Sequence, residues 1–280
     1  MGLTWYAPCL RCRACRAGRQ WLCSGSSSGR HRLPDGRTPL HRPDGSDVLA
    51  YCGIATFGEA IVVPAQAAIP MPAGTPPEVA ALIGCCVSTG VGAVTKTTRV
   101  EAGASVVVIG LGGVGLSAVM GAALAGASPI VAVDRVPAKL ELARELGATT
   151  GVLAVDRTAT DAAIREATGG GPDYTVEAIG LPSTIEQAIE LLRPGGTAVL
   201  VGMTPFGTRA SFEVFPFVDG GRTILGSNYG SAVAAEDFPR YAALHLAAAC
   251  RSSGSSTGES ASPMSRTRSI GCAVATAFGR

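Results

Sequence analysis

Apolar runs of strand length and longer helix-like segments alternate regularly along the chain from Ser105 onwards. The first run, SVVVIG, is fully apolar, and later helical segments carry apolar residues at i, i+3 and i+4. This pattern predicts a parallel, doubly wound α/β sheet. The expected strands are 105–110, 129–134, 151–155, 174–179, 195–202 and 222–227, and the expected helices lie within 112–127, 137–148, 158–168 and 183–192.

The chain before Ser105 follows a different pattern. Residues 24–47 are polar and predict a loop, whereas 48–63 are β-branched and aromatic residues broken by Gly, as in the short strands of a small barrel. Residues 64–80 hold five prolines and predict an extended crossing segment, and 81–97 predict a helical entry into a second domain. We therefore expect two domains of different architecture.

Composition places the chain among globular proteins. Of its 280 residues 47% are apolar and 16% are charged, which suits one large domain or two ordinary ones. The net charge of +2 gives no general reason to expect a nucleic acid or a membrane surface as a partner. We find no signal-peptide pattern and no apolar run of membrane-span length that is free of Gly or charge, so we expect a reduced, cytoplasmic setting.

Four cysteines near the start have the spacing C-x2-C-x2-C-x7-C, and they are Cys9, Cys12, Cys15 and Cys23. In a reduced setting this spacing favours metal binding over disulfides. Four thiolates can surround one tetrahedral zinc ion and leave no position for exchange, which makes the expected site structural. The basic first 45 residues also allow a zinc-ribbon nucleic-acid binder, but base-stacking aromatics and a second zinc knuckle are missing.

The motif G-x-G-x-x-G lies between the first apolar strand and the helix after it, at Gly110, Gly112 and Gly115. In that context the glycines allow a tight turn, close approach of a pyrophosphate and close helix packing. Asp134 closes the next strand, where an acid accepts hydrogen bonds from an adenosine ribose and repels a 2′-phosphate. We therefore expect NAD rather than NADP, although Arg135 is adjacent.

Taken together, residues 3–249 resemble the zinc-dependent medium-chain alcohol dehydrogenases. The resemblance is carried by CLRCRACRAGRQWLC, GCCVSTGVGAV, VIGLGGVG, VAVDRVPAKLELARELGAT and PGGTAVLVG. It implies a Rossmann domain with part of a GroES-like β-barrel catalytic domain, and transfer of hydride between an alcohol or aldehyde and NAD with the help of zinc. The implied divisions are 1–80 for the partial catalytic domain with its zinc lobe, 81–230 for the Rossmann domain, 231–249 for the return to the catalytic domain and 250–280 for an aberrant tail.

The resemblance also implies roles for single residues. The four N-terminal cysteines match ligands of a structural zinc, and Cys85 matches one ligand of a catalytic zinc, with a buried core cysteine as the alternative. Cys86 stands where the family usually has Gly, and Thr89 matches a residue beside the nicotinamide. The implied cofactor-binding residues are Gly110, Leu111, Gly112, Gly113, Val114, Gly115, Asp134, Arg135, Lys139, Ile179, Gly180, Val201 and Gly202.

The chain departs from the family pattern at the catalytic zinc. The family's zinc-binding His lies in a Gly-His-Glu motif before the structural-zinc lobe, and none of His31, His41 and His245 has that context. With Cys85 alone a zinc ion would not be held. We therefore expect a polypeptide that is truncated at its N-terminus relative to the family, binds NAD weakly and turns over little. The alternative is a non-catalytic, NAD- and zinc-binding pseudoenzyme or gene fragment.

The last residues, 251–280, hold eight Ser and three Thr but no Leu, Lys or Asp. One interpretation is a disordered tail. We favour a frameshift near position 250, because this segment can be back-translated and read one frame away as a C-terminal segment similar to that of the family. The family also pairs through its cofactor domain, so we expect a homodimer or homotetramer in which 222–230 forms an edge strand at the subunit contact.

Overall fold

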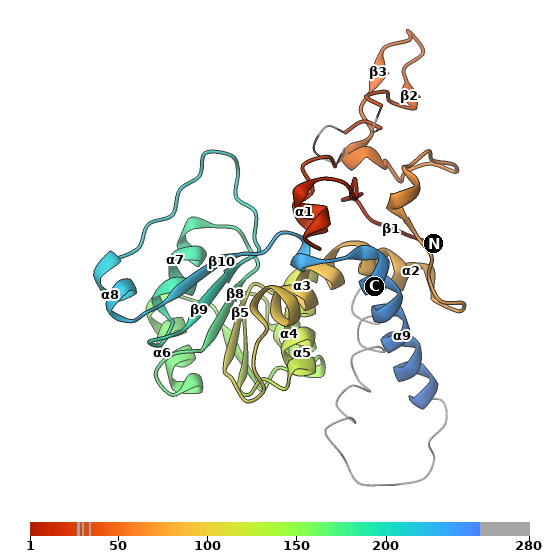
Figure 1. Ribbon diagram of the computed structural model, residues 1–280. Helices are drawn as coiled ribbons and strands as arrows, with labels where there is room; N and C mark the ends of the chain where they lie inside the picture. Colours follow the sequence, from red (N-terminus) through yellow and green to blue (C-terminus); the bar gives the residue numbers. More distant parts are fainter. Residues whose placement is uncertain (27–28, 30, 34, 253–280) are drawn as a thin grey trace. The chain divides into compact units, whose positions relative to one another are not determined.

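A six-stranded parallel sheet is the centre of the larger of two structural units (Figure 1). The computed structural model describes residues 1–26, 29, 31–33 and 35–252. Its first unit is Met1–Cys85 with Ser231–Ala243, and its second is Cys86–Gly230 with the residues from Leu244 on. The expected aberrant tail lies outside the described residues beyond Ser252.

The strand order of the sheet is β10-β9-β8-β5-β6-β7, and all neighbouring strands run parallel. The strands are β5 (Val106–Ile109), β6 (Ile130–Asp134), β7 (Thr150–Leu153), β8 (Tyr174–Glu177), β9 (Thr197–Leu200) and β10 (Thr223–Gly226). All six expected strands are confirmed. Because β5 pairs with both β6 and β8, the chain reverses its direction across the sheet at β5, and the carboxyl ends of these strands form the crevice in which such folds bind ligands.

Helices cover both faces of this sheet, as the fully buried strand β5 requires (Figure 1). They are α4 (Gly113–Ala125), α5 (Pro137–Glu145), α6 (Arg157–Thr168) and α7 (Pro182–Glu190), and all four were expected. One core cluster joins Val107 and Val131 of the sheet to Ile164 of α6 and to Leu191, which follows α7. A short helix, α8 (Val214–Asp219), precedes β10.

Small residues let α3 (Ser88–Gly92) approach α4 very closely. A Cβ atom at Gly90 would lie 2.2 Å from the carbonyl oxygen of Val114, and one at Gly121 would lie 3.0 Å from the Cα of Val91. The run of Gly and Ala in this part of the sequence is therefore a packing requirement. It brings the helix that carries Thr89 against the first turn of α4.

Between Met1 and Cys85 the described residues of the first unit form short strands and helices. They are β1 (Gly2–Leu3), β2 (Leu40–His41), β3 (Asp47–Val48), β4 (Ala68–Ile69), α1 (Arg13–Arg16) and α2 (Pro77–Leu82). Strand β1 pairs antiparallel with β4, and β2 pairs antiparallel with β3. In the described residues these are two separate two-stranded pairs, and the barrel expected for this part of the chain stays a prediction.

The expectation of short strands throughout 48–63 is wrong. Only Val48 of that segment belongs to a strand, and a 3₁₀ turn follows at Tyr51–Gly53. Cys52 and Ala55 adopt φ values of +53° and +40°, which an extended strand does not allow. In this segment the turns form in spite of the preference of β-branched residues for strands.

Two long helical stretches connect the parts of the fold. The first continues from α2 through π-helical turns at Ile83–Val87 and Ala93–Thr98, and the second is α9 (Ala234–Ser252). The stretch Pro77–Thr98 is long and apolar enough to cross a membrane by length and composition, and 56% of its most apolar window is buried inside the protein. A core helix of a globular protein has the same properties.

Asp173 braces the amino ends of β5 and β8. Its Oδ2 accepts hydrogen bonds from the backbone N–H and the hydroxyl of Ser105, at 2.8 and 2.7 Å, and Arg193 forms an ion pair with its Oδ1. Burial alone would raise the pKa of Asp173, but the Ser105 hydrogen bonds and the Arg193 charge hold it below its ordinary value. The brace lies at the edge of the sheet opposite the crevice, so it supports the fold without touching a ligand there.

We expect Asp173→Ala to cost about 2 kcal/mol of stability, because it leaves the Ser105 donors unpaired. Since the pKa is lowered on folding, this stabilisation is complete above the unfolded-state pKa of about 3.9 and is lost as the pH falls through the folded value. Thermal unfolding of wild type and variant from pH 7 downwards measures the difference between their free energies of unfolding, and we expect that difference to become smaller below about pH 4. Glu141→Ala, which removes an exposed ion pair with Arg144, is the control, and equal unfolding of the two variants would show that the brace contributes nothing.

Candidate functional site

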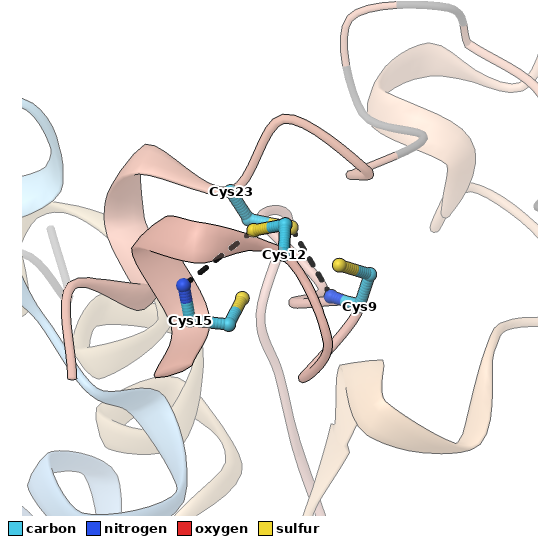
Figure 2. A group of neighbouring side chains, drawn as sticks. All are labelled: Cys9, Cys12, Cys15 and Cys23. Carbon is cyan, nitrogen blue, oxygen red and sulfur yellow. Dashed lines mark hydrogen bonds between the residues drawn. The ribbon is translucent and has the colours of Figure 1, made fainter. Parts of the chain in front are cut away.

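The four N-terminal cysteines come together around one point (Figure 2). Their Sγ atoms all lie within 4.8 Å of one another, and those of Cys12 and Cys23 are 4.0 Å apart. A tetrahedral zinc ion with Zn–S bonds of about 2.3 Å separates its sulfur atoms by about 3.8 Å. The thiols therefore fit a closed zinc site, as the sequence spacing predicts.

Short local elements hold these thiols in place. Cys12 is the N-cap of α1, where its Sγ accepts a hydrogen bond from the N–H of Cys15, and Cys23 follows a 3₁₀ turn at Gln20–Leu22. The N–H of Cys9 donates to the Sγ of Cys23 at 3.1 Å. Donors of this kind stabilise thiolates, which are the form that binds metal.

The acidities of the thiols differ with their surroundings. The hydrogen bond from the Cys15 N–H lowers the pKa of Cys12 to about 5, and a backbone hydrogen bond from Arg11 lowers the pKa of Cys9. Burial raises the pKa of Cys15 to about 12. A cation that binds all four must therefore displace a proton from Cys15.

Gly25 was not recognised from the sequence but borders this site. A Cβ atom there would lie 2.9 Å from the Cβ and the Sγ of Cys9. The position is two residues beyond Cys23, in a Ser- and Gly-rich segment that otherwise reads as an ordinary loop. Its role depends on a contact that no sequence pattern records.

The second site lies at the carboxyl end of β5, where the three motif glycines have different functions. Gly110 has φ +91°, a conformation that favours Gly. A Cβ at Gly115 would lie 1.7 Å from the carbonyl oxygen of Gly110, so the helix and the turn are in direct contact. At Gly112, the N-cap of α4, a Cβ would meet no atom within 4 Å. This open space beside the free N–H groups of a helix start fits a phosphate group.

Asp134 closes β6 beside this turn, with its side chain 11% exposed. Its Oδ2 accepts the N–H of Leu111 at 2.8 Å, and its Oδ1 accepts the N–H of Val136 at 3.0 Å. The Nζ of Lys139 lies 3.6 Å from Oδ2, while Arg135 is exposed. The structure thus brings the expected ribose-binding pair to the glycine turn.

The later strands end at the same edge. Ile179 follows β8, and its side chain occupies the space that a Cβ at Gly110 would need. Such a Cβ would lie 2.3 Å from Cγ1 of Ile179. A Cβ at Gly202, after β9, would lie 2.1 Å from the N atom of Gly180. The structure therefore gathers all thirteen expected cofactor residues at one edge: Gly110, Leu111, Gly112, Gly113, Val114, Gly115, Asp134, Arg135, Lys139, Ile179, Gly180, Val201 and Gly202.

Glu177, the last residue of β8, is the principal residue of this edge that sequence analysis missed. It is fully buried, and its Oε1 accepts the N–H groups of Ile179 and Gly180 at 2.9 Å each. The same oxygen accepts the Thr184 hydroxyl at 2.8 Å. The only available sequence signal was one acid in the otherwise strand-like run YTVEAI.

Thr89 and Cys85 are the remaining expected residues. Thr89 lies on α3 in the second unit and is partly buried, and a Cβ at Gly230 would lie 2.6 Å from its carbonyl oxygen. Cys85 lies in the π-helical turn at the end of the first unit, where it is partly exposed and where desolvation by nearby protein atoms raises the pKa of its thiol. In the described part of the chain the four N-terminal cysteines are the only group of three or more metal-ligating side chains close enough to share an ion, and Cys85 is not among them.

The comparisons with known proteins agree with this geometry. A family model described as zinc-binding dehydrogenase matches residues 113–248. The S-(hydroxymethyl)glutathione dehydrogenase of Saccharomyces cerevisiae is 36% identical over 232 residues, which are 80% of this chain and 60% of that protein. The structure of an alcohol dehydrogenase zinc-binding domain protein from Burkholderia ambifaria is 37% identical, with a TM-score of 0.82, and covers 88% of this chain and 67% of that one.

The structure of benzyl alcohol dehydrogenase from Acinetobacter calcoaceticus is 31% identical, with a TM-score of 0.77, and covers 88% of this chain and 67% of that one. A doubly wound sheet with a glycine turn at its reversal point is the architecture of dinucleotide-binding domains, and the four-cysteine lobe before it fits a structural metal ion. The chain belongs to the zinc-dependent medium-chain alcohol dehydrogenase family. It spans between 60% and 65% of the length of the curated relatives it matches.

We expect Gly112→Ala and Gly115→Ala to fail in different ways. The methyl group at position 112 enters open space, so folding is preserved while NADH binding weakens about tenfold or more. The methyl group at 115 collides with the Gly110 carbonyl and lowers the thermal midpoint. Fluorescence titration with NADH and thermal unfolding separate the two effects, and an unchanged NADH affinity in Gly112→Ala would contradict the assignment of the open space.

We expect the purified chain to carry about one zinc ion, held by the four-cysteine lobe. Cys15→Ser removes a buried ligand and should abolish that zinc content, whereas Cys52→Ser, a cysteine outside the lobe, should leave it unchanged. Metal analysis by mass spectrometry gives both values. Zinc retained in Cys15→Ser would mean that the ion is held elsewhere.

Proposed function

We propose that the chain binds NAD at the carboxyl edge of its sheet and serves hydride transfer between a small alcohol or aldehyde and NAD. The observation that carries this proposal is the open space at Gly112 beside the start of α4, with Asp134 and Lys139 next to it. A glycine turn at a helix start, with an acid at the end of the next strand, is the arrangement by which doubly wound sheets bind dinucleotides. When bound, NAD supplies the hydride acceptor or donor.

The residues of the chain bind and orient the cofactor in this proposal. N–H groups at the start of α4 face the pyrophosphate, and Asp134 accepts hydrogen bonds from the adenosine ribose with Lys139 beside it. The loops at Ile179–Gly180 and Val201–Gly202 receive the other half of the molecule. We propose that Thr89 lies beside the nicotinamide, because it matches a residue of the family motif.

The catalytic metal is the finer part of the proposal. Zinc, when bound at such a site, polarises the alcohol oxygen and favours its alkoxide. Cys85 is the residue of this chain proposed to contribute to it, and its thiol must lose its proton to do so. Because Cys85 belongs to no group of three or more candidate ligands in the described residues, we propose that this polypeptide alone binds NAD and turns over little.

A non-catalytic NAD- and zinc-binding protein is the alternative. An assay of NADH formation from ethanol, benzyl alcohol and S-(hydroxymethyl)glutathione separates the two, since the alternative predicts binding with no zinc-dependent rate for any of them. Benzyl alcohol and S-(hydroxymethyl)glutathione are taken from the names of two relatives, a benzyl alcohol dehydrogenase and an S-(hydroxymethyl)glutathione dehydrogenase. The assay shows which of these alcohols is oxidised.

We also propose that the chain forms a homodimer or homotetramer through β10. This strand ends the sheet, and in the described residues it pairs only with β9. The nearby α8 exposes Phe215 and Val218, which are 80% and 70% exposed. An unpaired strand edge beside apolar side chains is a surface that proteins normally cover, and light scattering of the purified chain reports the assembly.

We expect wild type to bind NADH about tenfold or more tightly than NADPH, because the Asp134 carboxylate repels a 2′-phosphate. Asp134→Asn keeps one hydrogen-bond acceptor and removes the charge, so the preference should shrink mainly through tighter NADPH binding. Glu166→Gln on α6, an exposed acid away from the crevice, is the charge-matched control. Equal wild-type affinities for the two cofactors would contradict the role of Asp134, and binding of neither would contradict the proposed function.

A further inference from the structure

Glu177 joins the two loops that lie on the far side of the crevice from Asp134. Its side-chain Oε1 accepts the N–H groups of Ile179 and Gly180 in the loop after β8. Its backbone oxygen accepts the N–H groups of Val201 and Gly202 after β9, at 2.9 and 3.0 Å. One residue thus organises both loops through four backbone donors.

The packing around Glu177 leaves little freedom for these loops. A Cβ at Gly202 would lie 2.6 Å from Oε2 of Glu177, and one at Gly180 would lie 2.7 Å from the carbonyl oxygen of Met203. Thr184, in the first turn of α7, adds its hydroxyl to Oε1 at 2.8 Å. The carboxyl group therefore fixes the loop after β8 to the following helix, while the backbone oxygen of the same residue holds the next loop.

Stability alone does not explain an acid at this position. Glu177 is 0% exposed, and its Oε2 is buried with no hydrogen-bond partner in the described part of the structure. A buried polar atom without a partner is unfavourable compared with an apolar side chain of similar shape. What the residue provides in return is a set of backbone N–H groups held in one arrangement at the ligand edge.

The two halves of a dinucleotide would lie over different strands of the crevice, so these N–H groups would face only one half. A dinucleotide lies across the carboxyl edge at the reversal point between β5 and β8, and the ribose acceptor Asp134 places the adenosine half over β6. The nicotinamide half then lies over β8 and β9, on the loops that Glu177 holds. The side chain of Ile179, which contacts the position of Gly110, lies between the two halves.

We propose that Glu177 is a positioning residue for the nicotinamide half of the cofactor, acting through the loops at Ile179–Gly180 and Val201–Gly202. The adenosine half is bound independently of it, by the glycine turn and Asp134. This inference rests on the proposed NAD site and adds a residue that determines which part of the ligand is held in place.

The test compares NADH with AMP, which carries only the adenosine half. Glu177→Met removes the acceptor but keeps the length of the side chain, so NADH binding should weaken about tenfold or more while AMP binding changes less than about twofold. Glu177→Gln offers a carbonyl oxygen to the same donors and should restore NADH binding to within about threefold of wild type. Calorimetric titrations of the full 280-residue chain measure all of these affinities.

Two further variants keep the test independent of folding. Thr184→Val removes one donor to Oε1 from a partly exposed residue, and it should weaken NADH binding about threefold without affecting AMP. Thr175→Val, also in β8, removes the buried hydrogen bond from the Thr175 hydroxyl to the Ala188 carbonyl. This hydrogen bond involves neither loop. It should lower the thermal midpoint while the ratio of the NADH and AMP affinities stays at the wild-type value.

The outcomes separate this inference from the function on which it rests. If wild type binds both ligands and the Glu177 and Thr184 variants keep the wild-type ratio, the positioning role is wrong while the NAD site stands. If the variants lose AMP and NADH in proportion, Glu177 is only structural. If wild type binds neither ligand, the proposed function itself is wrong. A selective loss of NADH, rescued by Gln, supports the inference.

Discussion

The pairing of β5 with both β6 and β8 is the constraint on which the cofactor edge depends. This pairing makes β5 one of the two central strands and turns its carboxyl end into the meeting point of loops from four strands. The Asp173 brace holds the amino ends of β5 and β8 together, and Glu177 holds the loops at their carboxyl ends. Asp173, which is partly exposed, and the buried Glu177 lie at opposite ends of β8, so they fix the strands at one edge of the sheet and the ligand-binding backbone at the other.

The two candidate sites differ in how they are built. The four-cysteine lobe is assembled from fifteen consecutive residues, Cys9–Cys23, by one helix N-cap and one 3₁₀ turn. The cofactor edge draws on residues from Gly110 to Gly202 and exists only when the whole sheet has formed. A change that unfolds the sheet should therefore remove cofactor binding, while the metal lobe retains its local geometry.

The sequence was sufficient to predict those elements of the fold whose residues follow a recognisable pattern of apolar and polar positions. The strand Val106–Ile109 is apolar throughout because helices cover both of its faces, and the glycine motif is recognisable because it lies between that strand and a helix. The segment 48–63 was misjudged, since β-branched composition says nothing about the left-handed conformation of Cys52. Glu177 and Gly25 were missed for a different reason: their importance lies in contacts with residues that fold around them.

The central claim is that one sheet edge, from the glycine turn to the β8 and β9 loops, receives the whole dinucleotide. Hydrogen–deuterium exchange of the full chain with and without NADH tests it most directly, because it reports on each loop separately. The account predicts slower exchange of the amides in 110–116, 179–181 and 201–203 on NADH binding, with the amides of Ser105 and Asp173 unchanged. Protection limited to other segments, or no protection in the presence of saturating NADH, would contradict it.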